Sequence, residues 1–152
     1  PDACELLTKN IANNHLESVT LYQFALSDQE GDATLFTGGR YPDSLTMSLF
    51  NSSGQKAGEK IKTRMISSYL QEEVDLLKLD VEGSEKDILH DLFRSKKINL
   101  IKEMIIEFHP FISKVTVEEF IESVTQNNFR CAPEMDQLHP GSTDWIIRCF
   151  RQ

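Results

Sequence analysis

Apolar and polar residues follow two different periods along this chain, and the changes of period predict where helices and strands lie. Residues 2–14 place a capping aspartate ahead of apolar positions at helical spacing, which predicts a helix. Residues 19–26 alternate apolar and polar side chains and are rich in β-branched and aromatic types, which predicts a strand. A second, short strand is predicted over 32–37, after a turn.

The stretch 38–59 differs from the rest, because it is rich in glycine and serine and has little periodicity. A connection of this length without regular structure is uncommon in a compact domain and often serves as a lid or binding loop, although a disordered insertion would look the same. Residues 60–66 alternate polar and apolar positions, and their basic side chains suit an edge strand with one solvated face. One short helical turn is predicted over 67–71.

Two segments, 74–81 and 100–108, are almost continuously apolar, which is typical of parallel strands that helices cover on both faces. Ser84 can cap a helix over 85–94. A capping box then precedes a further helix that ends near residue 127.

Two short strands, at 129–132 and 145–150, complete the pattern, and a loop between them makes the last strand antiparallel. Strands that alternate with helices predict a single α/β domain over residues 1–152, with a mostly parallel sheet and an antiparallel last strand. A chain of this length buries roughly 70% of its unfolded surface, so it can form a core without disulfides or metals.

The charge balance narrows the choice of partners. The chain has 24 acidic and 16 basic side chains, a net charge of −8, and no long Lys/Arg cluster, so we expect no nucleic-acid partner. No apolar run approaches the roughly 18 residues of a membrane span, so we expect no membrane partner either. Three widely spaced cysteines, Cys4, Cys131 and Cys149, fit no zinc spacing and favour a reducing, cytoplasmic location.

Candidate chemistry gathers where the two apolar strands end. Asp80 and Glu82 are two positions apart at the end of 74–81, and Glu107 and His109 have the same spacing at the end of 100–108. Strand alternation places each pair on one face. Because ligands bind beyond the carboxyl ends of strands in α/β sheets, and consecutive strands are often neighbours, these four groups are expected to converge on one rim.

Such a cluster has three uses: to bind a divalent cation, to supply a general base of raised pKa, or to hydrogen-bond a polar ligand. Alternatively, Glu107 pairs with Lys78 or another basic group, and His109 is a surface residue before a proline. Most of the seven acidic side chains within 72–87 are interpreted as a solvated helix face. The sequence contains no Gly-x-Gly-x-x-Gly, Walker or Gly-x-Ser-x-Gly motif, so neither a phosphate cradle nor acyl-transfer chemistry is indicated.

The segment 76–85, Leu-Leu-Lys-Leu-Asp-Val-Glu-Gly-Ser-Glu, closely resembles the Lys-x-Asp-Val-Glu-Gly-x-Glu signature of the FkbM family of S-adenosylmethionine-dependent methyltransferases. Segments 24–31, 64–70 and 105–109 resemble other parts of that family in the same order. The resemblance covers most of residues 1–110. It implies a Rossmann-like class I methyltransferase sheet, here with its third to seventh strands.

The resemblance also implies a cofactor, S-adenosyl-L-methionine, and the residues that bind it. By analogy with the family, Ala25, Leu26 and Ser27 lie beside the adenine, and Asp80 lies beside the methionine portion. We assign no residue to a metal under this interpretation.

Methyl transfer needs alignment of the acceptor oxygen, the methyl carbon and the sulfonium sulfur, and a base if the acceptor is a hydroxyl. The catalytic candidates are Glu82 or His109 as that base, and Asp80, which orients the ligand. Family members typically methylate hydroxyls of sugars or small natural products, so the resemblance implies a small-molecule methyl acceptor.

The sequence departs from the family pattern in two ways. Ser67 and Ser68 stand where aspartates are usual. The glycine-rich first βαβ unit is also absent, and this absence predicts a partial domain, truncated at its N-terminus, that binds cofactor weakly or not at all. Two other hypotheses stay open. One is a metal-dependent hydrolase that uses the cluster formed by Asp80, Glu82, Glu107 and His109. The other is a non-catalytic methyltransferase-like module that binds a partner, or a second copy, through an exposed sheet edge.

Overall fold

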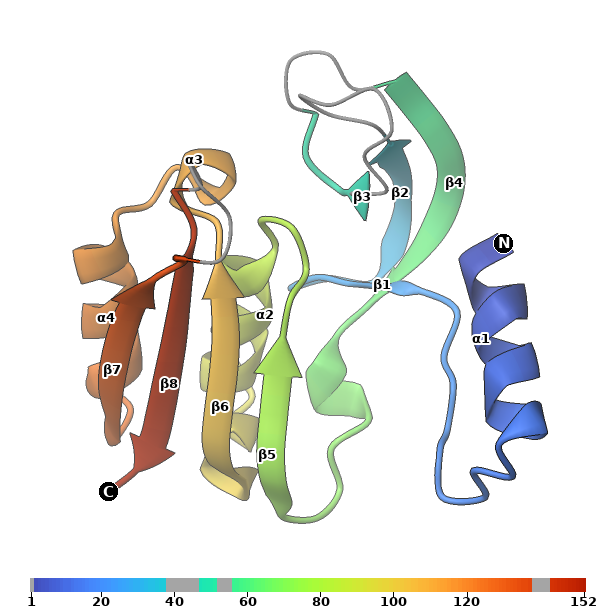
Figure 1. Cartoon of the computed structure of the whole chain (residues 1–152). Coiled ribbons are helices and arrows are strands. Elements are labelled where there is room, and N and C mark those ends of the chain that lie inside the picture. The colour runs from blue at the N-terminus through green and yellow to red at the C-terminus, as the bar shows by residue number, and fades with distance from the viewer. Residues whose placement is uncertain (1, 38–46, 52–55, 138–142) are drawn as a thin grey trace.

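The computed structural model describes residues 2–37, 47–51, 56–137 and 143–152. Within these residues the strands form two four-stranded sheets, which stand side by side in Figure 1. The first sheet has the order β1-β4-β2-β3 and the second has the order β5-β6-β8-β7. The predicted loop at 38–59 lies partly outside the described residues.

The first sheet is built on a long antiparallel pair. Its strands are β1 (Ala25–Leu26), β2 (Gly31–Thr37), β3 (Met47–Ser48) and β4 (Lys56–Arg64). The prediction of an edge strand at 60–66 is only partly correct: β4 pairs with β2 from Lys56 to Thr63, and on its other side it pairs with β1 at Thr63 and Arg64. The strand predicted over 19–26 shortens to two residues, which pair in parallel with the end of β4.

The second sheet carries the buried core. Its strands are β5 (Val74–Leu79), β6 (Ile101–Phe108), β7 (Phe129–Met135) and β8 (Trp145–Arg151). Strands β5 and β6 are parallel, whereas β8 is antiparallel to both β6 and β7, which confirms an antiparallel last strand. The prediction of a mostly parallel sheet is wrong, because the β2–β4 and β7–β8 pairs make both sheets mixed.

The main helices follow their apolar stripes. The helices and short 3-10 turns are α1 (Asp2–Asn13), η1 (Ile66–Ser68), α2 (Glu85–Arg94), η2 (Lys97–Leu100), α3 (Pro110–Ser113) and α4 (Val117–Thr125). In α2 the residues Ile88, Leu89 and Leu92 are buried. The predicted capping box begins α4, where the Thr116 side chain accepts from the Glu119 backbone. Both α2 and α4 lie on the same side of the second sheet (Figure 1).

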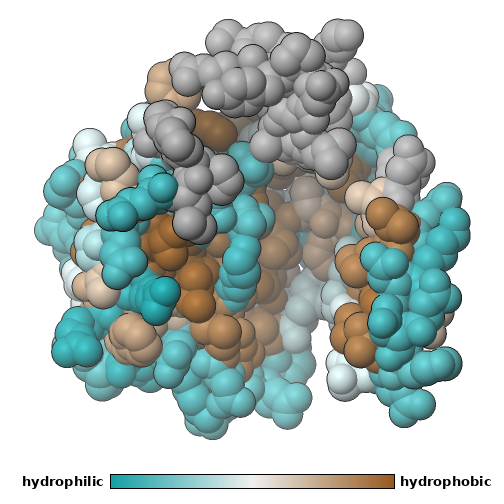
Figure 2. Space-filling view, in the orientation of Figure 1, coloured by the Kyte–Doolittle hydropathy of each residue, from teal (hydrophilic) through white to brown (hydrophobic). Residues whose placement is uncertain are grey.

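The core lies between these helices and the second sheet. Phe108 of β6 stacks on Phe120 of α4 with ring centroids 4.1 Å apart, and both side chains are buried. The prediction of burial on both faces fails for β5, since it pairs only with β6 among the described strands and Leu76 is 51% exposed. Figure 2 shows apolar side chains on the face of this sheet turned to the viewer and along the adjacent side of α1.

One covalent link ties the last two strands together. Cys131 and Cys149 face each other across β7 and β8 and form a disulfide, while Cys4 is free. Because disulfides are rare in reducing compartments, the cysteines no longer support a cytoplasmic location. Among the described residues, no helix has the length and apolar character needed to cross a membrane.

Candidate functional site

The candidate site lies where the parallel strands β5 and β6 end. Their register places Leu79 opposite Ile106, so Asp80, just after β5, follows beside Glu107, which is still in β6 and pairs with Ile146 of β8. One potential ligand atom each from Asp80, Glu107 and His109 lies within 4.8 Å of the others. The convergence expected from the sequence is therefore present in the fold.

A tight turn connects β5 to α2 at this rim. Glu82 has φ 51° and Gly83 has φ 106°, both in the left-handed region that favours glycine. A Cβ atom on Gly83 would lie 2.2 Å from Cγ2 of Ile112, so no larger residue fits without movement of α3. The turn is thus fixed both by its backbone conformation and by the packing of α3 against it.

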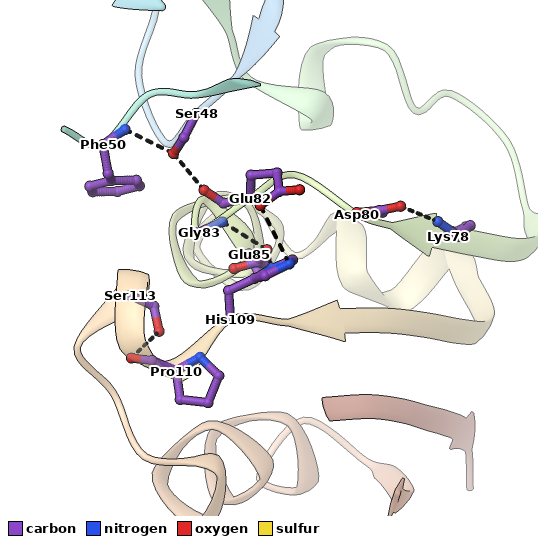
Figure 3. A network of polar contacts seen from close by, with 10 residues as sticks. All are labelled: Ser48, Phe50, Lys78, Asp80, Glu82, Gly83, Glu85, His109, Pro110 and Ser113. Carbon is purple, nitrogen blue, oxygen red and sulfur yellow. Dashed lines mark hydrogen bonds and ion pairs between the residues drawn. The ribbon is translucent and has the colours of Figure 1, made fainter. Parts of the chain in front are cut away.

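The first sheet reaches the same turn through Ser48. The buried Ser48 hydroxyl donates a hydrogen bond to the Glu82 carbonyl at 2.6 Å and accepts one from the Phe50 amide at 3.0 Å (Figure 3). This contact joins residues 34 positions apart in the sequence. It holds the segment 47–51 over the β5–α2 turn.

A buried acid–histidine pair lies beneath the rim. Glu85, the first residue of α2, is fully buried, and its Oε1 lies 2.8 Å from Nδ1 of His109 and accepts from the Gly83 amide at 3.0 Å (Figure 3). The interpretation of residue 85 as part of a solvated helix face is wrong. The alternative of a surface histidine is also wrong, since His109 is 5% exposed. Ser84 does occupy the N-cap of α2, but its side chain makes no capping hydrogen bond.

The charges around this pair shift two pKa values. Burial opposes protonation of His109, but the hydrogen bond to Glu85 and the negative charges of Glu85, Glu82 and Asp144 outweigh it and raise the pKa of His109 to about 9. Burial raises the pKa of Glu82, and the neighbouring carboxylates of Asp80, Asp144 and Glu107 raise it further, against the attraction of His109. At neutral pH the histidine is therefore an imidazolium beside the Glu82 carboxyl group, with Nε2 and Oε2 3.6 Å apart.

Lys78 takes a different partner from the one considered in the sequence. Its ammonium lies 2.7 Å from Oδ2 of Asp80, so the alternative pairing of Lys78 with Glu107 is wrong. The side chain of Glu107, unlike its backbone, makes no hydrogen bond or ion pair with any described residue. It is therefore open to a ligand at the rim.

The predicted adenine-binding residues lie elsewhere on the domain. Ala25 and Leu26 form β1, and the Ser27 amide donates to the Arg64 carbonyl at 3.0 Å. Within the described residues these three make no hydrogen bond to the rim. The next residue, Asp28, contacts α2 instead, through its carbonyl to Arg94 at 2.9 Å.

Sequence reasoning missed three contributors to the site: Glu85, Ser48 and Asp144. A weak signal existed for Glu85. This residue begins α2 directly after β5, and the neighbouring strand β6 ends next to His109. No local pattern marks Ser48, whose contact is long-range. Asp144 precedes β8 and acts through its charge on His109 and Glu82.

A parallel β5–α2–β6 unit with acidic groups at the strand ends is the ligand-binding arrangement of α/β enzymes. Residues 1–131 match the family model described as the methyltransferase FkbM domain, and the chain belongs to this family of methyltransferases. The resemblance noted in the sequence is thereby confirmed. No curated protein and no solved structure matches the chain.

Proposed function

We propose that this chain is an S-adenosylmethionine-dependent methyltransferase domain that acts on a hydroxyl group of a sugar or small natural product. The observation that carries the proposal is the β5–α2 turn: a left-handed Glu82–Gly83 pair that projects one carboxyl group to the rim above a buried Glu85–His109 pair. This turn lies inside the matched family segment.

The chemistry of the rim suits a positively charged cofactor. S-adenosylmethionine carries a methyl group on a sulfonium and an α-ammonium group, and the described rim groups are predominantly carboxylates. We assign Asp80, whose side chain is 42% exposed and pairs with Lys78, to orienting the methionine portion. The assignment of Ala25, Leu26 and Ser27 to the adenine rests on the family resemblance alone.

We assign the role of base to Glu82 rather than His109. A hydroxyl acceptor must lose its proton as the new bond forms, and a base works best when its pKa approaches the working pH. Burial and neighbouring carboxylates raise the pKa of Glu82 in that direction. Without a bound metal, His109 already carries a proton at neutral pH, so we do not assign it as the base.

The cofactor affinity of these 152 residues is expected to be weak. The sequence contains no glycine-rich turn that would bind the cofactor. It also contains no acidic residue after such a turn that would hydrogen-bond the ribose. We therefore propose weak cofactor binding by these residues and slow transfer at high cofactor concentration.

A labelled-methyl assay tests this function. The chain is incubated with millimolar S-adenosylmethionine and a panel of glycosides and polyols, and O-methyl products are counted. We expect slow transfer that Glu82→Gln lowers by about 100-fold or more. The control variant is Glu103→Gln, on the exposed part of β6, which should keep the activity. Transfer no faster than in a protein-free blank, or full activity in Glu82→Gln, would contradict the proposal.

A further inference from the structure

We propose that Asp80, Glu107 and His109 bind one divalent first-row cation, and that this cation positions the acceptor hydroxyl next to Glu82. The binding site is inferred from the geometry of the described residues. Its use in catalysis rests on the function proposed above.

The first argument is the spacing of the three groups. Their ligand atoms lie within 4.8 Å of one another. Ligands about 2.1 Å from a common ion are at most roughly 4.3 Å apart, so small side-chain rotations close the site. The β5–β6 register makes this spacing a property of the sheet, because Asp80 and Glu107 each follow a paired residue.

The second argument is the orientation of His109, which is fixed from outside the cluster. Nδ1 of the ring lies 2.8 Å from Oε1 of the fully buried Glu85, which leaves Nε2 as the nitrogen that faces the rim (Figure 3). Metal-binding histidines almost always have their other nitrogen held by a carboxylate or carbonyl in this way. The second oxygen of Glu85, Oε2, is buried and has no hydrogen-bond partner among the described residues.

The third argument is the local charge. Among the described residues the carboxylates outnumber the cations that offset them. The carboxylates are Asp80, Glu82, Glu85 and Glu107, and the basic side chains that pair with them are Lys78 and His109. A dication bound between these groups would reduce this repulsion.

The donor set indicates which ions fit. Two carboxylates and one imidazole suit Mn²⁺, Fe²⁺ or Zn²⁺ better than Ca²⁺, which prefers oxygen ligands only. Three protein ligands leave coordination positions for water or substrate. Lys78 contacts only Oδ2 of Asp80, so Asp80 can bind an ion through its other oxygen, Oδ1.

A bound cation would lower the pKa of the acceptor hydroxyl. In the transfer step the O–H bond breaks and its proton passes to the Glu82 carboxylate. The oxygen lone pair forms a bond to the methyl carbon, and the carbon–sulfur bond breaks with its electron pair on sulfur. The products are the methyl ether and the neutral thioether S-adenosylhomocysteine, so charge and atoms balance.

Mn²⁺ binding to the purified chain tests the site without any cofactor. The electron paramagnetic resonance signal of free Mn²⁺ should fall with a stoichiometry of one ion per chain. Glu107→Gln should weaken binding by about 10-fold or more, and Glu85→Gln, a positioning change, by about 10-fold. The control is Glu103→Gln, on the same face of β6, which should bind as the wild type does.

Two results would overturn the proposal: Glu107→Gln binding Mn²⁺ as tightly as Glu103→Gln does, or no stoichiometric binding at all. Circular dichroism spectra confirm that each variant is folded. Cofactor binding is measured separately in buffer with a chelator. Mn²⁺ binding without cofactor binding would support the cation site and refute the proposed function. Cofactor binding without Mn²⁺ binding would support the proposed function and refute the cation site.

Discussion

Substitution of Gly83 by alanine is expected to destabilise the domain strongly. Its φ of 106° lies where side chains are rarely accommodated, and such backbone strain costs about 1–3 kcal/mol. The new Cβ would also lie 2.2 Å from Cγ2 and 2.9 Å from Cβ of Ile112, and overpacking of this kind costs about 1–3 kcal/mol. Together they predict a loss of about 2–6 kcal/mol, a large part of the 5–15 kcal/mol that holds a typical domain folded.

Urea denaturation followed by circular dichroism measures this loss. The matched control is Gly31→Ala, because a Cβ there meets nothing closer than Oγ1 of Thr63 at 3.7 Å. That variant should be unchanged or more stable by about 0.4–1 kcal/mol, since alanine restricts the unfolded chain. If Gly83→Ala is as stable as Gly31→Ala, the described turn is incorrect.

A double variant separates the two causes. Adding Ile112→Ala to Gly83→Ala removes the close contact but leaves the backbone strain, so part of the lost stability should return and about 1 kcal/mol or more should remain missing. Complete recovery would show that packing alone disfavours alanine. No recovery would show that α3 does not contact the turn.

Three further predictions concern the surroundings of the site. Ser48→Ala should lower the free energy of unfolding by about 1 kcal/mol, because the partly buried Glu82 carbonyl loses its donor; an unchanged urea midpoint would argue against this contact. The pKa of His109 is raised to about 9 from 6.5, so its charge stabilises the fold fully below pH 6.5, and this stabilisation is lost as the pH rises through 9. A histidine titration by NMR in chelator-containing buffer should show that midpoint, and one near 6.5 would contradict it. Reduction of the Cys131–Cys149 disulfide, which spans 18 residues, should lower stability by about 3 kcal/mol in denaturant titrations, and equal midpoints with and without reductant would refute this.

Local patterns were sufficient to predict the elements of the second sheet. The apolar run before Asp80 and the amphipathic stripe of α2 specify a strand and a helix whatever their neighbours are, and the helix bounds at 85–94 agree with the prediction. The first sheet was harder to predict. Whether β4 lies at an edge or in the middle depends on strands distant in sequence, and alternation reports only which face is solvated.

The candidate site could be predicted in part for the same reason. Sheet topology brings the ends of β5 and β6 together, so Asp80, Glu107 and His109 could be grouped in advance. Glu85 could not, because an acid at the start of a helix is nearly always solvated. Glu85 is the last residue of the Lys-x-Asp-Val-Glu-Gly-x-Glu signature, but the signature does not show that this acid pairs with His109, 24 positions later.

The central claim is that the β5–α2 rim binds S-adenosylmethionine, and NMR titration with the product S-adenosylhomocysteine tests it most directly. At millimolar ligand we expect saturable shifts of the amides of Asp80, Glu82 and Gly83. The amide of Asp75, at the opposite end of β5, should not move. The Asp80→Asn variant should need several-fold more ligand for the same shifts. An absence of shifts at the rim, or shifts confined to residues far from it, would contradict the account.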